Sequence, residues 1–247
     1  MNPQPRRIPV ALIQFDARPE QSDANLSDMG KLVQQAVEAG ARWIMFHEST
    51  VCDLTPNVDK HAEAVPEGES TCRMSALARQ HGCFICFGLA EKDHGRHFIT
   101  QVFVGPEGFI YRYRKTWLWR DLSDDGYRNE WIRYDPGAGP ELFELDSVRA
   151  TCFICADGEA PRCIERARLL KPQVVFYPNN RSELPDFGVF GQRAGQIRAP
   201  MLVTNRTGTS WMADCKGGNV IYSANGTVLA CSNRQGREEI LLHELEI

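Results

Sequence analysis

Apolar and polar positions alternate along this 247-residue chain with two periods, one typical of strands and one typical of helices. In the first half the pattern predicts, in order, a strand at 8–16, a helix at 25–40, a strand at 42–48, a helix at 70–82, a strand at 83–91 and a hairpin at 98–115 that turns at GPEG. We expect Ser70 to cap the helix at 70–82 and Gly82 to end it.

The same order of elements recurs in the second half. The pattern predicts a strand at 148–157, a helix at 160–171, a strand at 173–178, a helix at 187–199, a strand at 200–205 and a hairpin at 217–231 that turns at ANG. Between the halves, residues 116–147 carry the polar run RDLSDDGYRNE and the turn DPGAGP, so we expect mostly loop there.

A β-α-β-α-β-hairpin unit that is used twice predicts two sheets, each with helices on one face and a bare apolar face. Packing the two bare faces together gives an α/β fold, a four-layer α-β-β-α sandwich built from two related halves. The sequence therefore predicts one domain that spans residues 1–247.

Composition narrows the functional class. The chain has 28 basic and 32 acidic residues and a formal net charge of −4, which gives no electrostatic footprint for nucleic acid or an anionic membrane. No apolar run approaches the roughly 18 residues that cross a bilayer, and the short apolar run after the N-terminus is typical of a strand rather than a signal peptide. We expect a cytoplasmic protein that binds neither nucleic acid nor membrane.

The tetrapeptide CFIC occurs twice, at 83–86 and at 152–155, and two C-x-x-C pairs suggest a zinc site or a redox pair. Both copies are predicted on strands, where residues three apart point to opposite faces, so neither pair can share one metal ion. A thioredoxin-like pair would need a turn that opens a helix. The pattern therefore disfavours both sites, and most of the nine cysteines are expected to be reduced and buried.

Cys155 differs from the other cysteines in the segment on its C-terminal side. The letters ADGEAP predict a strand end, a turn at Gly158 and a helix with Pro161 early in it. Catalytic residues concentrate at such strand ends in open sheets, and a nearby helix N-terminus would lower the pKa of the thiol. Cys155 is therefore a candidate nucleophile, and the alternative is a buried cysteine at a strand end.

A cysteine nucleophile needs a proton acceptor and a group that stabilises an oxyanion. Of the six histidines only His47 lies at a predicted strand end, so a cysteine–histidine pair has weak support. Glu48 ends the strand at 42–48 and Lys115 ends the hairpin, at the same predicted sheet edge as Cys155. Lys115 would favour a thiolate and Glu48 would carry the proton, unless the two are an ordinary solvated glutamate and an exposed lysine.

At these residues the chain resembles the nitrilase superfamily of carbon–nitrogen hydrolases. The resemblance covers nearly the whole sequence and rests on VALIQFD, MFHES, YRYRKTWL, ICADGEAP, QVVFYPN, VTNRTG and GNVIYSANGTVLA. It implies the same α-β-β-α sandwich and a Glu-Lys-Cys triad, which maps to Glu48, Lys115 and Cys155. The segment NEWIRYDPG resembles a family segment with a second glutamate and points to Glu130.

The resemblance also implies a mechanism. Glu48 takes the thiol proton, the thiolate of Cys155 attacks the carbonyl carbon, and Lys115 with the backbone N–H of Ala156 stabilises the oxyanion. Ammonia or an amine leaves, and water hydrolyses the thioester, while Glu130 orients the substrate nitrogen and Lys115. No metal or organic cofactor is needed, and the expected assembly is a homodimer or a higher homo-oligomer. Because the chain ends at LLHELEI, larger assemblies that need a long C-terminal extension are less expected.

The letters after the nucleophile narrow the substrate. True nitrilases resemble C-W-E, whereas Cys155, Ala156 and Asp157 resemble the amidase and carbamoylase branches, which favours a small linear amide or N-carbamoyl (ureido) compound over a nitrile. The chain departs from the family at Ala156 (usually bulky), at His47 (often Pro), at Arg162 (usually Glu) and over Gly-Glu-Ala at 158–160, so substrate inference from relatives is weakened.

Two charges leave the sign of the substrate tail open. Glu159 would favour a cationic tail and Arg181 a carboxylate, and each is otherwise a solvated surface charge. Asn179, which closes QVVFYPN, is a further candidate substrate contact. The other functional hypotheses are a catalytically silent relative that binds a small molecule, which the intact Glu48, Lys115 and Cys155 oppose, and a metal or redox protein built on CFIC.

Overall fold

The computed structural model describes residues 6–120, 129–210 and 213–247, and its architecture is two six-stranded mixed sheets. In the first sheet β1, β2 and β3 are parallel, and β14, β4 and β5 run antiparallel to their neighbours. The order across that sheet is β14 (Glu239–Glu246), β1 (Arg7–Gln14), β2 (Trp43–Met45), β3 (Phe84–Asp93), β4 (Arg96–Gly105) and β5 (Gly108–Arg114).

The second sheet repeats this arrangement. Its three central strands, β7, β8 and β9, are parallel, with an antiparallel strand on one side and two on the other. The order is β6 (Phe143–Leu145), β7 (Val148–Cys152), β8 (Val174–Pro178), β9 (Met201–Thr204), β12 (Val220–Tyr222) and β13 (Val228–Cys231). A small separate ribbon pairs β10 (Thr207–Thr209) with β11 (Asp214–Lys216).

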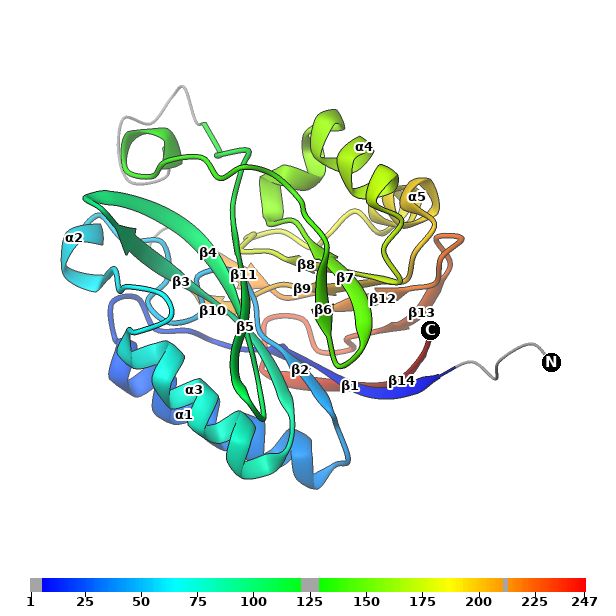
Figure 1. Cartoon of the computed structure of the whole chain (residues 1–247), viewed down its shortest axis with the longest axis horizontal. Helices are drawn as coiled ribbons and strands as arrows, with labels where there is room; N and C mark the ends of the chain where they lie inside the picture. The colour runs from blue at the N-terminus through cyan, green and yellow to red at the C-terminus, as the bar shows by residue number, and fades with distance from the viewer. Residues whose placement is uncertain (1–5, 121–128, 211–212) are drawn as a thin grey trace.

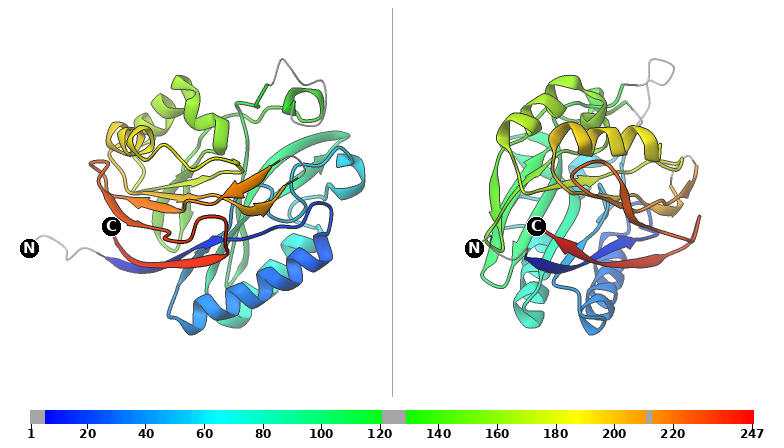
Figure 2. Two further views of the ribbon diagram at one scale, coloured as in Figure 1. Left: turned by 180° about the vertical axis from the view of Figure 1, so that it is seen from behind. Right: turned by 90° about the vertical axis from the view of Figure 1, so that its right-hand side faces the viewer.

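Helices cover the outer face of each sheet. Figure 1 and the turned views of Figure 2 show α1 (Ser22–Glu38) and α3 (Glu69–His81) on the first sheet, and α4 (Pro161–Leu170) and α5 (Phe187–Ile197) on the opposite side of the molecule, over the second. The short helix α2 (Val58–His61) lies at the end of the first sheet. The predicted four-layer α-β-β-α sandwich of two related halves is confirmed.

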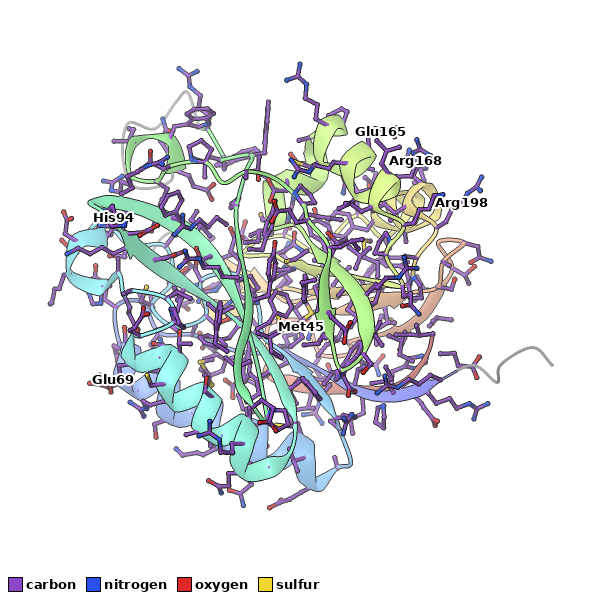
Figure 3. All side chains as sticks on the ribbon, in the orientation of Figure 1. Met45, Glu69, His94, Glu165, Arg168 and Arg198 are labelled. Atoms are coloured by element: carbon purple, nitrogen blue, oxygen red, sulfur yellow. The ribbon has the colours of Figure 1, made fainter. Side chains whose placement is uncertain are left out.

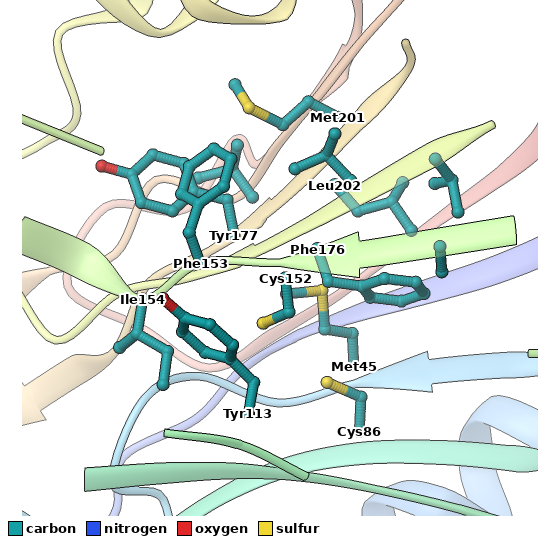
Figure 4. Packing of buried hydrophobic residues seen from close by; sticks show 14 of the residues in the cluster. Met45, Cys86, Tyr113, Cys152, Phe153, Ile154, Phe176, Tyr177, Met201 and Leu202 are labelled. Carbon is teal, nitrogen blue, oxygen red and sulfur yellow. The ribbon is translucent and has the colours of Figure 1, made fainter. Parts of the chain in front are cut away.

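The two bare sheet faces meet in an aromatic core. The Phe103 ring of β4 meets the Phe176 ring of β8 edge-on at 5.1 Å between centroids, an arrangement that aromatic quadrupoles favour. Figure 4 shows Phe176 with Met45, Cys86 and Cys152 in the layer between the sheets. This apolar contact fixes how the sheets sit on each other, and therefore where the strand ends of the two halves meet.

Most predicted elements agree with the structure to within a few residues, and the exceptions have local causes. Gly82 ends α3 in the left-handed region with φ 64°, as predicted. Ser70 is not the cap, because α3 begins at Glu69 after Gly68. The Ser70 N–H and hydroxyl both donate to the Glu63 carboxylate, so Glu63 accepts one of the backbone N–H groups that a helix start leaves without an intrahelical acceptor.

Two edge strands were not predicted. β6 lies within 116–147, where mostly loop was expected, and β14 lies beyond the last predicted hairpin. Together they complete the symmetry of the halves, because each flanks the first parallel strand of its sheet on the outer side. The loop prediction for most of RDLSDDGYRNE falls on 121–128, outside the described residues.

The two CFIC copies differ in structure. Cys83 and Cys86 point to opposite faces of the first sheet, as predicted, because Cys86 belongs to the core between the sheets and Cys83 to the core under the helices. The strand prediction at 148–157 is wrong beyond Cys152, since Cys155 opens the 3₁₀ helix η2 (Cys155–Glu159). Cys152 and Cys155 are therefore not separated by the two faces of one strand. All nine cysteines are free thiols.

Candidate active site

A buried lysine lies between two carboxylates at one end of the sandwich. Lys115 follows β5, Glu48 lies in the turn after β2, and Glu130 opens the 3₁₀ helix η1 (Glu130–Ile132). The Lys115 ammonium donates to Oε1 of Glu48 at 2.7 Å and to Oε1 of Glu130 at 2.7 Å. Their side chains are 0%, 1% and 3% exposed, so the structure brings three of the four predicted catalytic residues into direct contact away from water.

The environment sets the charge of each group. Burial alone would lower the pKa of Lys115, but the carboxylates of Glu130 and Glu48 outweigh it and hold that pKa well above its ordinary value. Burial raises the pKa of Glu130 to about 7, against the opposing effect of Lys115. The second oxygen of Glu130 accepts the Trp119 N–H at 2.6 Å. Lys115 is thus a fixed cation beside a carboxyl group that titrates near neutral pH.

Glu48 has one oxygen free for chemistry. Oε1 accepts from Lys115, while Oε2 is buried and has no hydrogen-bond partner within the described part of the chain. A buried carboxylate oxygen without a donor is costly unless something else uses it, so it is a ready proton acceptor.

Cys155 lies at the start of η2 with its backbone strained. Its φ of +45° is uncommon for a residue other than glycine, and such strain is often found at functional positions. The Tyr177 hydroxyl donates to the Cys155 carbonyl at 2.8 Å, which helps to hold the turn (Figure 4 shows Tyr177).

The expected lowering of the thiol pKa is wrong. Burial, and then the negative charge of Glu48, raise the pKa of Cys155 to about 11, although Arg181 and Lys115 oppose the shift. At neutral pH the group is therefore a thiol rather than a standing thiolate. Attack by this sulfur requires a base in the same step, which is the role that the geometry leaves open for Glu48.

Asp157 joins the segment of Lys115 to the turn of Cys155. Its carboxylate accepts the Ile154 N–H at 2.9 Å, and this bond ends β7 by turning the chain away from β8. The same carboxylate accepts the N–H groups of Thr116 at 3.0 Å and Trp117 at 2.5 Å, directly after Lys115. The Tyr113 hydroxyl adds a fourth donor at 2.8 Å (Figure 4 shows this hydroxyl beside Ile154).

A cavity of about 470 Å³ opens beside Cys155 and Glu130, within the size range of small-molecule sites. Cys155, Glu130 and Trp119 line this cavity, together with residues from the segment after β8, from α5 and from around β10 and β11. The cavity residues are Leu54, Trp119, Glu130, Cys155, Glu159, Asn180, Arg181, Ser182, Glu183, Leu184, Pro185, Asp186, Val189, Phe190, Arg193, Ser210, Ala213 and Cys215.

The predicted substrate-binding residues divide into three groups. Glu159 and Arg181 both line the cavity, but they pair with each other at 2.8 Å. Asn179 is buried and does not line the cavity: its amide N–H donates to the Tyr177 carbonyl and its oxygen accepts from Arg181. Ala156 is buried in the first turn of η2, where its backbone N–H is one of the donors that a helix start leaves without an intrahelical acceptor.

His47 is a structural neighbour of the site rather than a base for Cys155. Its side chain is fully buried, and burial lowers its pKa to about 3, so the imidazole is neutral. Nδ1 lies 2.7 Å from the Glu48 carbonyl oxygen, which makes this nitrogen the donor. The ring therefore fixes the turn that carries Glu48.

Two features are absent from the described residues, a cluster of metal-ligating side chains and a membrane-spanning helix. Among these residues, no three or more His, Cys, Asp or Glu side chains gather in a way that would hold a metal ion. None of the helices in that same part of the chain is both long and apolar enough to span a membrane.

Comparison with known proteins identifies the family. The family model described as carbon-nitrogen hydrolase matches residues 9–247. The chain belongs to the carbon–nitrogen hydrolase family. It is 28% identical to a nitrilase from Pyrococcus abyssi over 97% of this chain and 90% of that protein. An omega-amidase from Xenopus tropicalis is 30% identical over 68% of this chain and 62% of its own length, and an N-carbamoylputrescine amidase from Solanum lycopersicum is 26% identical over 82% and 72%.

Solved structures share the fold of this carbon–nitrogen hydrolase. A CN-hydrolase superfamily protein from Xanthomonas campestris superposes with a TM-score of 0.85 at 17% identity, over 97% of this chain and 91% of that chain. An amidase from Nesterenkonia sp. gives 0.84 at 19% identity, over 97% and 90%. These structures confirm the α/β sandwich, and with the family match they identify the chain as a nitrilase-superfamily enzyme that hydrolyses carbon–nitrogen bonds.

Sequence reasoning missed some residues that shape the site of this hydrolase. Trp119 donates its N–H to Glu130, and Asp157 holds two strand ends together, whereas the sequence pattern presents Asp157 only as a marker of the amidase branch. Trp119 follows Lys115 by four residues and Asp157 follows Cys155 by two, so closeness in sequence to a predicted catalytic residue could have indicated both. Arg193, on α5, had no such signal, because only the fold brings that helix to the cavity.

Proposed function

We propose that this enzyme is a thiol amidohydrolase that cleaves a non-peptide carbon–nitrogen bond in a small linear amide or N-carbamoyl compound, through a thioester on Cys155. The observation that carries the proposal is the buried Lys115 bonded to both Glu48 and Glu130, with Glu130 and Cys155 lining one cavity. The relatives named omega-amidase and N-carbamoylputrescine amidase support the amide and ureido classes.

In the first half-reaction Glu48 removes the thiol proton as the sulfur of Cys155 forms a bond to the carbonyl carbon. The thiol pKa of about 11 makes this concerted transfer necessary, and the free Oε2 of Glu48 is the acceptor. The carbonyl π electrons move to oxygen, where the Lys115 ammonium and the Ala156 N–H stabilise the charge. Collapse of the intermediate breaks the C–N bond, and Glu48 returns its proton to the departing ammonia or amine.

In the second half-reaction Glu48 takes a proton from water as the water oxygen attacks the thioester carbon. The second tetrahedral intermediate is stabilised by Lys115 and Ala156 as before, the C–S bond breaks, and the proton on Glu48 returns to the sulfur of Cys155. Glu130 keeps Lys115 in place through both steps and orients the substrate nitrogen.

The proposal is tested by ammonia release from a panel of linear amides and ureido acids, combined with intact-mass analysis of a rapidly quenched reaction. We expect an acyl adduct on Cys155, loss of turnover in Cys155→Ala, and a decrease of about 10²–10⁴-fold in Glu48→Gln, which lacks the base. Cys231→Ala, at an exposed cysteine, is the matched control and should keep both adduct and rate. Turnover that survives in Cys155→Ala would refute the proposal.

A nitrile is the second candidate substrate, because the relative that aligns over 97% of this chain is named a nitrilase. The same thiol attack on a nitrile carbon gives a thioimidate, and two waters are needed to reach the acid and ammonia. Matched nitriles therefore belong in the panel. Faster turnover of a nitrile than of its amide would replace the amide proposal.

Three further expectations stay predictions: one domain over 1–247, a cytoplasmic location, and a homodimer or higher homo-oligomer. Light scattering of the purified chain measures the assembly directly.

A further inference from the structure

Of the charged side chains that the structure describes around the cavity, some are paired with an opposite charge, and others are not. Glu183 pairs with Lys216 at 2.5 Å, and Glu159 pairs with Arg181 at 2.8 Å, so both acids are neutralised by a neighbouring cation. The carboxylate of Asp186 accepts the N–H of Val189 at the start of α5 and lies exposed at the cavity edge, where water screens it.

Arg193 is the exception among the cavity cations. It lies on α5 with its guanidinium 4.9 Å from the centre of the Phe190 ring, so the aromatic face positions it. Its Nη1 is buried and has no hydrogen-bond partner among the residues that the structure describes, and no ion pair reaches it there. A guanidinium has five N–H donors in a fixed fork, so a buried nitrogen without an acceptor leaves a strong anion-binding group unused.

Arg181 is a second positive charge that lines the cavity. Its guanidinium lies 5.6 Å from the centre of the same Phe190 ring, and its Nε donates to Asn179 at 3.0 Å. Its positive charge acts on the Cys155 thiol, and it shares the Phe190 ring with Arg193. Two arginines over one aromatic ring thus define a cationic side of the cavity that begins beside Cys155.

We propose that the substrate of this enzyme carries an anionic group, a carboxylate, at the end remote from the scissile carbon–nitrogen bond, and that Arg193 binds this group. This inference rests on the proposed amidohydrolase function and specifies its substrate class as monoamides of dicarboxylic acids or ureido acids. Arg181, already paired with Glu159, contributes positive potential along the path, whereas Arg193 supplies the unused N–H donors. A cationic tail would place two like charges together in a partly desolvated pocket.

The experiment uses linear amides of four, five and six carbons, each with a methyl, a carboxylate or an ammonium group at the far end. Within each length the three compounds differ almost only in charge. We expect the carboxylate series to give the highest kcat/KM, mainly through a lower KM. In Arg193→Gln the ratio of kcat/KM for the carboxylate over the methyl compound should fall about 10–100-fold, the usual effect of losing a hydrogen-bonded charge. Arg193→Lys should restore part of that ratio.

Arg168→Gln is the matched control, since it removes one arginine charge from the adjacent helix α4. Figure 3 shows Arg168 and Glu165 on the outer surface of α4, where they pair at 2.6 Å, and Arg168 does not line the cavity. This variant should leave both kcat/KM and the substrate ratio unchanged.

Calorimetric binding to Cys155→Ala separates this inference from the proposed function, because it needs no turnover. Two results together support the anionic subsite even if no panel member is hydrolysed. The carboxylate compounds should bind Cys155→Ala more tightly than the methyl compounds, and this advantage should decrease in the double variant Cys155→Ala/Arg193→Gln. Equal binding of carboxylate and methyl compounds, or a preference for ammonium, would overturn the subsite while leaving amide hydrolysis intact. A ratio that does not change in Arg193→Gln would overturn it as well.

Discussion

A lysine that is completely removed from water keeps its charge only if opposite charges contact it. Lys115 has two such contacts, at 2.7 Å each, and the cost of burying three ionisable groups is offset by their mutual attraction and by the N–H of Trp119. Since one ammonium neutralises one carboxylate, the second carboxyl group carries the excess charge. That residue is Glu130, whose pKa burial raises to about 7.

The raised pKa of Glu130 predicts a pH effect. Glu130 is protonated below about pH 7 and ionised above it, and only the ionised form accepts from both Lys115 and Trp119. We expect kcat/KM to rise through about pH 7. In Glu130→Gln that rise should disappear, and the rate at pH 8 should fall about 10–100-fold because one amide N–H now faces a donor.

The same variant has a signature in stability. An acid whose folded pKa is raised binds its proton more tightly in the folded state, so stability falls as pH rises from about 4.5 to 7. Urea denaturation across this window should show that fall in the wild type and a smaller one in Glu130→Gln. Glu165→Gln, on the surface of α4, is the control and should follow the wild type. An unchanged pH–rate profile in Glu130→Gln would contradict the assignment.

At the level of single residues, the sequence was sufficient to predict Glu48 and Lys115 at one sheet edge, because strand ends on one edge of a sheet lie close in space. Glu130 was predicted only from the resemblance of NEWIRYDPG to a family segment. The pKa of Cys155 could not be predicted from the sequence. A helix start and a lysine suggested a lowered thiol pKa, but the outcome depends on how completely the surrounding layers exclude water. Burial of that kind is a property of packed layers rather than of neighbouring letters.

The edge strand β14 covers the open edge of β1 in the first sheet. β14 pairs with every residue of β1, from Arg7 with Glu246 to Gln14 with Glu239, and so covers the hydrogen-bonding edge of a buried parallel strand. Only Leu245 of β14 is buried, and it packs in the core between the sheets. A strand with one buried side chain gives a weak alternation signal, and β6, with three residues, gives almost none, which is why neither was predicted.

Two leucines of β14 allow a matched test of this edge. Leu245 is 0% exposed and Leu242 is 45% exposed, although they lie three residues apart on one strand. Leu245→Ala should destabilise the fold by about 2–5 kcal/mol, the usual range for a buried leucine that leaves a cavity. Leu242→Ala should change stability by less than about 0.5 kcal/mol. Urea denaturation measures both, and equal effects would show that β14 is not anchored through the core.

The active site is assembled from both halves of the molecule. Glu48 and Lys115 come from the first sheet and Cys155 from the second, so their geometry depends on how the two sheets are held together. Polar contacts cross between the halves near the site: the Glu48 N–H donates to the Asn179 carbonyl at 3.3 Å, and the Thr204 hydroxyl to the Phe46 carbonyl at 3.1 Å. The sequence predicted the sandwich from its two bare faces, but these contacts depend on residues more than a hundred positions apart.

A buried ion pair also connects the two halves. Arg206 follows β9 of the second sheet, and its Nη1 lies 2.5 Å from the carboxylate of Asp53, which follows β2 of the first. Both side chains are at most 1% exposed. Asp53 also accepts from Asn180 at 2.8 Å and from Ser210 at 2.7 Å, and both of these line the cavity. The pair therefore connects the two halves and also holds two residues that line the cavity.

Breaking this pair should affect both stability and binding. Asp53→Asn and Arg206→Met should each destabilise the fold by about 3–5 kcal/mol, because each leaves one buried charge without its partner. The double variant should cost less than the sum of the two by about 0.5–3 kcal/mol, since it leaves neither charge unpaired. The surface pair Arg168–Glu165, mutated in the same way, should cost no more than about 1 kcal/mol. Asp53→Asn replaces one of the two carboxylate oxygens that accept from Asn180 and Ser210 with an N–H donor, so its KM should rise more than its kcat falls. Strictly additive stabilities and an unchanged KM would mean that this ion pair links neither the two halves nor the cavity.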